Sequence, residues 1–131
     1  MTYRFIEHTA ELELELEAGS EAGVFGAALE ALRELVSSGD GGEPVRHELE
    51  LPVDDRTLLL VDWLNELLFL VEVEQFVPER LAAFESTSTT LRCTVAGRRG
   101  RPRHLVKAVT LCGAELRQEG ETWHAHLVLD V

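Results

Sequence analysis

The run from residue 11 to residue 17 places the strongest constraint on how this chain can fold. It reads ELELELE, so glutamate and leucine alternate without interruption. Side chains of a β-strand point alternately to its two faces, whereas a helix would scatter these leucines around its axis. The run therefore predicts a strand with one apolar face in a core and one acidic face in solvent. Residues 3–8 are also strand-like, so the region is either one bent strand or two short ones.

The same period of two recurs along the chain, bounded by proline and glycine. An alternating segment ends at Pro52, because proline cannot continue the hydrogen-bonded ladder of a strand. The turn Glu119-Gly120-Glu121 is typical of a hairpin. Strands are expected near residues 45–51, 80–86, 90–96, 104–111, 114–118 and 122–130.

Two helices are expected between these strands. Ser20 is a suitable cap for a helix that runs to about Val36. Asp54 or Asp55 opens a second helix over about residues 55–73, which is apolar on nearly all sides and should be central in the core. Strands and helices do not alternate regularly, so we expect an α+β fold in one domain over residues 1–131. Its architecture is a mostly antiparallel sheet or sandwich with two packed helices.

The charge is strongly negative and unevenly distributed. The chain has 24 acidic and 12 basic residues, a formal net charge of −12. Residues 1–60 hold 14 acidic and 4 basic residues, and residues 91–131 hold 4 and 7. Such a surface repels phosphate backbones, which disfavours broad nucleic-acid binding and favours cations or basic protein surfaces as partners. The alternative is a soluble surface that implies no partner.

The chain shows no targeting signal that we can identify. Its N-terminus lacks the basic and apolar regions of a signal peptide, and its apolar runs, such as residues 58–61, are too short to span a bilayer. Cys93 and Cys112 are the only cysteines, so reduced thiols in the cytoplasm are expected. Both lie in strand-like apolar runs, and we expect them to be buried rather than nucleophilic.

The end of the chain is a candidate cation site. The side chain of Asp130 lies beside the α-carboxylate of Val131, and two acids one residue apart form an oxygen-rich donor set suited to Mg²⁺ or Ca²⁺. Glu11 would supply a third ligand if the first and last strands are neighbours. The alternative is a solvated, frayed chain end, which is the usual fate of termini.

Two other groups of residues have weaker functional interpretations. His124 and His126 share one strand face, about 6.5–7 Å apart, but their spacing matches no common zinc pattern, so we interpret them as solvent-face residues. Residues 97–103 contain four arginines among glycine and proline, which predicts a mobile loop able to hold phosphate. No aromatic residues intervene there to stack bases, so the Arg98–Arg103 loop is also explained as a merely solvated one.

Classical catalysis has little support, because the chain has no nucleophile elbow, phosphate-binding loop or dinucleotide-binding fingerprint. Four stretches, however, resemble the archease family in content and order. They are FIEHTAELELELEA at 5–18, LLLVDWLNELLFL at 58–70, VKAVTLCGAEL at 106–116 and WHAHLVLDV at 123–131. The resemblance spans essentially the whole chain, and the second and fourth stretches are distinctive together.

The resemblance implies a fold and a function. Archeases are small accessory proteins of RNA processing with a sandwich-like sheet and two helices. They associate with the RtcB-type RNA ligase of tRNA splicing, promote guanylylation of its active-site histidine and speed its turnover. Some are linked to a tRNA methyltransferase as chaperone-like factors. The resemblance therefore implies a non-catalytic protein, with an RtcB-type ligase as partner and a tRNA methyltransferase as the alternative partner. RNA contact would be indirect or through the Arg98–Arg103 loop.

The resemblance also implies a divalent-cation site, which is assigned to calcium in the family, although Mg²⁺ or Mn²⁺ would suit the same oxygens. Its ligands fall on Glu11, Asp130 and Val131. His8, in the same HTAE step, and Lys107, the only lysine of the chain, are candidate partner contacts.

Two departures from the family pattern affect this transfer. The family usually has aspartate at the Glu11 position, and the extra methylene moves the carboxylate outward. Leu111-Cys112 stands where the family has Tyr-His. A rival from another class is a stand-alone metal-dependent phosphoester hydrolase that uses His124 or His126 as base.

Overall fold

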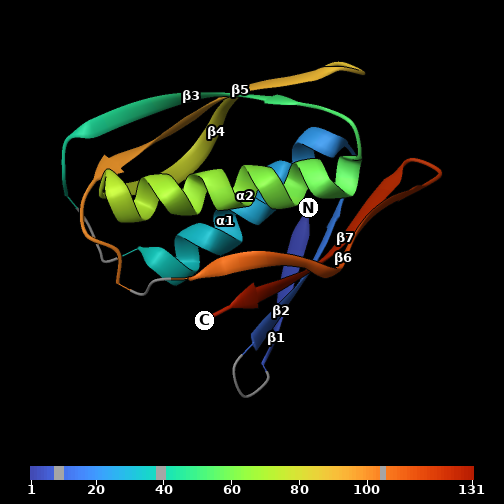
Figure 1. The fold of residues 1–131 in the computed structure, drawn as a ribbon, viewed down its shortest axis with the longest axis horizontal. Coiled ribbons are helices and arrows are strands. Elements are labelled where there is room, and N and C mark those ends of the chain that lie inside the picture. Colours follow the sequence, from blue (N-terminus) through green and yellow to red (C-terminus); the bar gives the residue numbers. More distant parts are fainter. Residues whose placement is uncertain (8–10, 38–40, 104–105) are drawn as a thin grey trace.

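The computed structural model describes residues 1–7, 11–37, 41–103 and 106–131 (Figure 1). Along the chain its elements are β1 (Thr2–Glu7), β2 (Glu11–Ala18), α1 (Glu21–Val36), β3 (Pro44–Pro52), α2 (Arg56–Val73), β4 (Phe76–Ser86), β5 (Thr90–Arg99), β6 (Ala108–Glu119) and β7 (Thr122–Asp130). Strands β1, β2, β7 and β6 form, in that order, an antiparallel sheet that we call sheet A. Strands β3, β5 and β4 form the antiparallel sheet B. The predicted α+β class is confirmed.

The two helices lie between the sheets rather than on one outer face (Figure 1). Helix α1 contacts β2 of sheet A and β4 of sheet B, and α2 contacts β6 and also β3 and β4. Their side chains meet in one apolar core, in which Trp63, Phe25 and Phe76 are fully buried. The indole N–H of Trp63 donates to the sulfur of Cys93 at 3.0 Å. Neither α1 nor α2 is long and apolar enough to cross a membrane, nor is any other helix in the described part of the chain.

The helix starts follow from capping side chains. The hydroxyl of Ser20 accepts a hydrogen bond from the N–H of Gly23 at 3.0 Å, as predicted for the start of α1. Of the two candidate caps for α2, Asp55 is used, and its carboxylate accepts from the N–H of Leu58 at 3.0 Å. Each cap satisfies a backbone donor that the helix itself leaves unpaired.

The first two strands form a hairpin, which decides between one bent strand and two short ones. Strand β1 pairs antiparallel with β2, with Thr2 opposite Glu17 and Glu7 opposite Leu12. Along β2 the leucines are buried and the glutamates face outward, as the alternation predicts. The same holds for β7, where Ala125, Leu127 and Leu129 are buried. Sheet A therefore has an apolar inner face on the helices and a polar outer face.

Strands β4 and β5 are longer than predicted, and the loop prediction for Arg98–Arg103 is wrong for its first two residues. Arg98 and Arg99 belong to β5, where they lie opposite Val77 and Phe76 of β4. Gly97 makes this possible, because a Cβ at that position would overlap with the backbone of β4. Proline in β4 masked the strand in the sequence. The structure accommodates Pro78 beside a register shift at the sheet edge.

The segments predicted at 104–111 and 114–118 are parts of one strand, β6, which begins at Ala108. Residues 104–105 of the first segment lie outside the described residues. Its pairing with β7 is interrupted between Thr110 and Glu115, where the register shifts and Gly113 adopts a positive φ of 84°. Such an irregularity re-aims side chains without ending the strand. The sequence did not predict this irregularity, because a glycine between two strand-like segments is typical of a turn.

Strand β6 is an edge of sheet A, and α2 satisfies part of its open backbone. The amide of Asn65 donates to the carbonyl of Val109 at 3.0 Å and accepts from the N–H of Val109 at 2.9 Å. The hydroxyl of Thr57 accepts from the N–H of Leu116 at 3.0 Å. Together these contacts fix α2 antiparallel along β6. They also occupy backbone groups of the edge strand with which a strand of another molecule could otherwise pair.

Candidate cation site

Strands β2 and β7 bring the two predicted halves of the site together. In their antiparallel register Glu11, the first residue of β2, lies directly opposite Asp130, the last residue of β7. Their neighbours Leu12 and Leu129 are buried in the core. Because side chains alternate between faces, both carboxylates project from the outer face of sheet A.

The chemistry of this pair fits a divalent cation. Directly opposite residues of an antiparallel pair have Cβ atoms about 4.5–5.5 Å apart, within reach of one ion bound at about 2.3–2.6 Å from each oxygen. Like charges in such a pair repel each other. No ion-pair partner for either carboxylate lies in the described residues. A bound cation would remove that repulsion, which is the physical argument for a site here.

Lys107 and Val131 flank the pair. The backbone N–H of Lys107 donates to the backbone carbonyl of Asp130 at 2.8 Å, so the start of β6 is fixed beside the end of β7. Val131 follows Asp130 and is exposed, with 47% of its surface accessible. Val131 therefore stands at the same sheet end as Glu11.

Side chains alone do not complete a metal centre. Within the described parts of the chain, no three histidine, cysteine, aspartate or glutamate side chains are grouped closely enough to hold a metal ion. Any site at Glu11 and Asp130 thus needs the Val131 carboxylate, backbone carbonyls or water as further ligands. His8, the predicted partner contact, lies outside the described residues.

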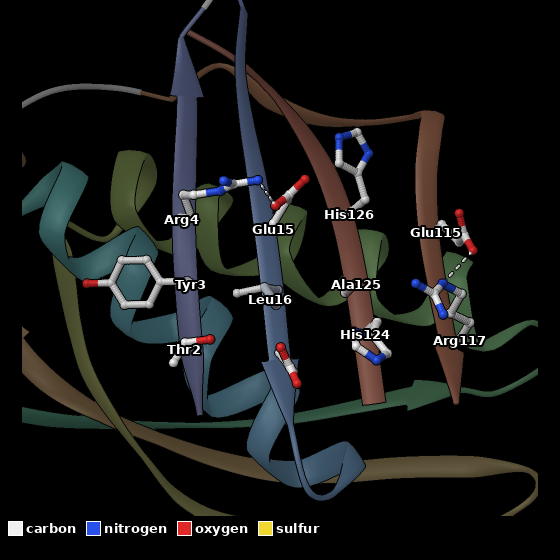
Figure 2. A pocket seen from close by; sticks show the side chains of 11 residues that line it. Thr2, Tyr3, Arg4, Glu15, Leu16, Glu115, Arg117, His124, Ala125 and His126 are labelled. Atoms are coloured by element: carbon white, nitrogen blue, oxygen red, sulfur yellow. Dashed lines mark hydrogen bonds and ion pairs between the residues drawn. The ribbon is translucent and has the colours of Figure 1, made fainter. Parts of the chain in front are cut away.

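The two histidines lie apart from the carboxylate pair. His126 is opposite Glu15, and His124 is opposite Glu17, on the outer face of sheet A (Figure 2). At the rise of a strand, His126 lies about 13 Å along β7 from Asp130. Their interpretation as outer-face residues agrees with their burial, 28% and 33% exposed for the side chains of His124 and His126. Neither lies where a general base for chemistry at Asp130 would be needed.

His126 makes contacts that the sequence did not suggest. Its Nδ1 is 3.0 Å from the carbonyl oxygen of Gly113, and its Nε2 is 2.9 Å from a carboxylate oxygen of Glu13. Both partners are acceptors, so both bonds form only when the ring is doubly protonated. The Gly113 carbonyl and then the Glu13 carboxylate raise the pKa of His126, against a lowering by partial burial. In the sequence, only Gly113 indicated an unusual backbone here. The irregularity in β6 directs the carbonyl of Gly113 toward the His126 ring.

The outer face around these histidines is a shallow polar depression (Figure 2). Arg4 of β1 pairs with Glu15 of β2, and Arg117 pairs with Glu115 along β6 at 3.2 Å. Arg4 and Arg117 offset part of the negative charge of this face, because Glu15, Glu17 and Glu115 line the same depression.

The arginines after Gly97 are mostly engaged within the protein. Arg98 lies 3.4 Å from Glu79 and donates to the carbonyl of Gly42 at 3.1 Å, and Arg103 donates to the carbonyl of Glu34 at 2.9 Å. These contacts tie β5 to β4 and to the segment before β3, and they tie the segment after β5 to α1. They reduce the number of guanidinium groups available for phosphate.

The cysteines have different surroundings. Cys93 is buried, as expected, and burial raises the pKa of its thiol. The prediction that Cys112 is buried is wrong, because it is exposed in the irregular part of β6 beside Leu111, which is 53% exposed. Residues there leave the regular pairing with β7, so the alternation of faces no longer applies.

Fold and site together define a class of small α+β protein, with two helices between antiparallel sheets and a carboxylate pair where the first hairpin meets the last strand. The model of the Archease protein family (MTH1598/TM1083) matches residues 3–131. The chain therefore belongs to the archease family. Protein archease of Methanosarcina acetivorans is 29% identical over 139 residues, which cover 98% of this chain and 95% of that protein.

Solved structures agree with this assignment. The solution structure of Methanobacterium thermoautotrophicum protein 1598 has a TM-score of 0.73 and 26% identity, over 98% of both chains. The crystal structure of an archease from Thermotoga maritima, described as a possible chaperone, has a TM-score of 0.71 and 20% identity, over 96% of this chain and 94% of that one. The second likeness bears on the fold alone.

Proposed function

We propose that this archease is a non-catalytic accessory protein of RNA processing that activates an RtcB-type tRNA-splicing RNA ligase. It would promote guanylylation of the ligase and its multiple turnover through a divalent-cation site at Glu11, Asp130 and Val131. Family membership supports the general role. The observation that carries the site is the placement of Glu11 directly opposite Asp130, two acids 119 positions apart in sequence that share one sheet end.

The residues at this end of sheet A would have different roles in binding the cation. Glu11 and Asp130 would hold the cation from the two strands, with Val131 as third oxygen ligand. The N–H of Lys107 holds the Asp130 backbone in place, which limits the motion of the last strand. When bound, Ca²⁺, Mg²⁺ or Mn²⁺ would supply positive charge for phosphate oxygens of the ligase's nucleotide. The acidic surface would favour fast, salt-sensitive association with a positively charged ligase.

Multiple-turnover RNA ligation by the cognate ligase tests the proposal. The ligase is assayed alone, with wild-type protein and with Asp130→Ala; Glu48→Ala, which removes an exposed carboxylate on β3 of the other sheet, is the matched control. We expect wild type and Glu48→Ala to raise turnover, and Asp130→Ala to lose most of the gain. In parallel, added Ca²⁺ should raise the melting temperature of the wild type more than that of Asp130→Ala.

Each outcome separates one part of the proposal from another. Stimulation that survives Asp130→Ala would keep the ligase role and remove the cation site from it. No stimulation by the wild type would refute the ligase role itself. Phosphoester hydrolysis by the protein alone would contradict the non-catalytic assignment.

A second candidate function is a chaperone-like role toward a protein client such as a tRNA methyltransferase. The Thermotoga maritima archease, which the matching family model names, is described as a possible chaperone. This role predicts that the protein suppresses aggregation of the methyltransferase or changes its site selection, with no effect on the ligase. Side-by-side assays with both candidate partners distinguish the two.

A further inference from the structure

Helix α2 is the central helix of the fold, yet one side of it is open to solvent. Figure 1 shows α2 crossing the middle of the molecule with no strand in front of it. Its exposed residues recur every three or four positions, so they form one line along the helix. We call this line the α2 stripe, and it consists of Leu58, Asp62, Glu66, Phe69, Glu72 and Val73.

The stripe is unusually apolar for a solvent-facing helix surface. Phe69 and Val73 are each 56% exposed and, being four residues apart, are neighbours on the helix. Leu58 is 36% exposed at the other end of the line. Among the described residues, the stripe holds three of the six large hydrophobic side chains that are exposed. Exposed apolar side chains gathered on one face are typical of a binding surface.

The polar residues of the stripe are all acidic. Asp62, Glu66 and Glu72 separate the apolar residues, and Asp62 and Glu66 stand four apart, where like charges repel. None of these three carboxylates has an ion-pair partner within the part of the chain that the structure describes. Some other surface acids are paired with arginine, as Glu79 is with Arg98. The stripe is thus an apolar surface with uncompensated negative charge.

We propose that the α2 stripe is the docking surface for a basic protein partner, the RNA ligase of the proposed function, on which this inference rests. An enzyme that binds RNA ends and a nucleoside triphosphate needs a positively charged surface. Basic residues of that surface would pair with the three carboxylates while an apolar recess takes Phe69 and Val73. RNA and anionic membranes are repelled by the same charges. Two copies of this chain joined stripe to stripe would place acid against acid.

The position of the stripe suits this role, because it leads toward the carboxylate pair. Helix α2 is anchored to β6 by Thr57 at Leu116 and by Asn65 at Val109, so Asn65 lies at the start of β6 and the later residues of the helix extend past it. The start of β6 is held to Asp130 by Lys107. In Figure 1 the C-terminal end of α2 and the C-terminus of the chain lie toward the same side. A partner docked on Phe69 and Val73 would therefore have Glu11 and Asp130 within its reach.

The test measures how stimulation of the ligase depends on the concentration of this protein. The double variant Phe69→Ser/Val73→Ser removes the apolar contact, and Glu66→Lys reverses one charge of the stripe. Glu48→Lys makes the same charge reversal on an exposed position of β3 and is the matched control. These side chains are exposed, so the variants are expected to keep their circular dichroism spectra and melting behaviour.

We expect the double variant to raise the half-maximal concentration for ligase stimulation by at least about tenfold, as for loss of an interface hot spot. The plateau at saturation should stay unchanged, whereas Asp130→Ala should lower the plateau. Glu66→Lys should weaken binding and its salt dependence, and Glu48→Lys should do neither.

Three results would overturn the inference. A half-maximal concentration within about twofold of wild type for both the double variant and Glu66→Lys would place the docking surface elsewhere while keeping the proposed function. A change in self-association upon Phe69→Ser/Val73→Ser, with ligase binding intact, would assign the stripe to a second copy of the chain. No stimulation by the wild type would refute the proposed function and this inference together.

Discussion

Asn65 offers the sharpest test of how the fold is held together. It lies on α2, in the stretch that resembles the archease family, and its half-buried amide makes two hydrogen bonds to Val109 on the edge strand β6. The substitution Asn65→Ala removes both bonds at once. It leaves the N–H and the C=O of Val109 without partners beneath a helix, where water reaches them only in part.

The expected loss follows from these two groups. An unpaired buried backbone group costs about 1–3 kcal/mol, and partial access of water puts both in the lower half of that range. We therefore expect Asn65→Ala to lower the free energy of unfolding by about 2–4 kcal/mol. Thr57→Val, which removes the single bond to Leu116, should cost about 1–2 kcal/mol. For a chain of this size, each kcal/mol corresponds to about 3–5 °C in melting temperature.

Urea denaturation followed by circular dichroism measures both losses. Asn65→Asp provides a further check, because its carboxylate still accepts from the Val109 N–H but faces the Val109 carbonyl. Protonation below about pH 4 turns the carboxyl into a donor, so its deficit relative to wild type should shrink there. A loss below about 1 kcal/mol for Asn65→Ala, or an Asn65→Asp deficit that is independent of pH, would refute the assignment of Asn65 as the partner of the edge strand.

Two further predictions concern sheet A and sheet B. The carbonyl of Gly113 and the carboxylate of Glu13 raise the pKa of His126, so the folded state holds the proton more tightly than the unfolded state. This stabilisation is complete below the unfolded-state value of about 6.5 and is lost as the pH rises through the folded-state pKa. His126→Gln should therefore cost more stability at pH 6 than at pH 9, and equal losses in urea titrations would contradict the double hydrogen bond. Gly97→Ala should cost roughly 1–3 kcal/mol, because its Cβ overlaps with β4, while Gly19→Ala, with open space around it, should be near neutral.

Local sequence patterns predicted most of the elements because their signals are local. The alternation over residues 11–17 and the capping residues Ser20 and Asp55 depend on neighbours a few positions away. The predictions were wrong where a distant strand overrides the local preference. Pro78 and Gly97 resemble breaks in a strand, but each lies in a paired strand because the opposite backbone accommodates it.

The candidate site also has one part that the sequence predicted and one part that depended on the tertiary structure. The oxygen donors Glu11, Asp130 and Val131 are predicted from residue chemistry and from the resemblance to archeases, without any knowledge of distance. Whether Glu11 and Asp130 lie close together depended on whether β2 and β7 are neighbours and on the register between these strands. A shift of that register by one residue would have turned one carboxylate toward the core.

The sequence by itself determined the apolar and acidic faces of the strands, the starts of the helices and the chemistry of the chain end. Those properties are set by side-chain period and by residue type. Only the tertiary structure decided that Glu11 lies opposite Asp130, that His126 has two acceptors and that α2 keeps an apolar and acidic side in solvent. The physical reason is that each of these depends on strand order, on register, on an irregularity in pairing or on how a helix packs against the sheets. Such features arise from packing between segments far apart in the chain, and no local pattern encodes them.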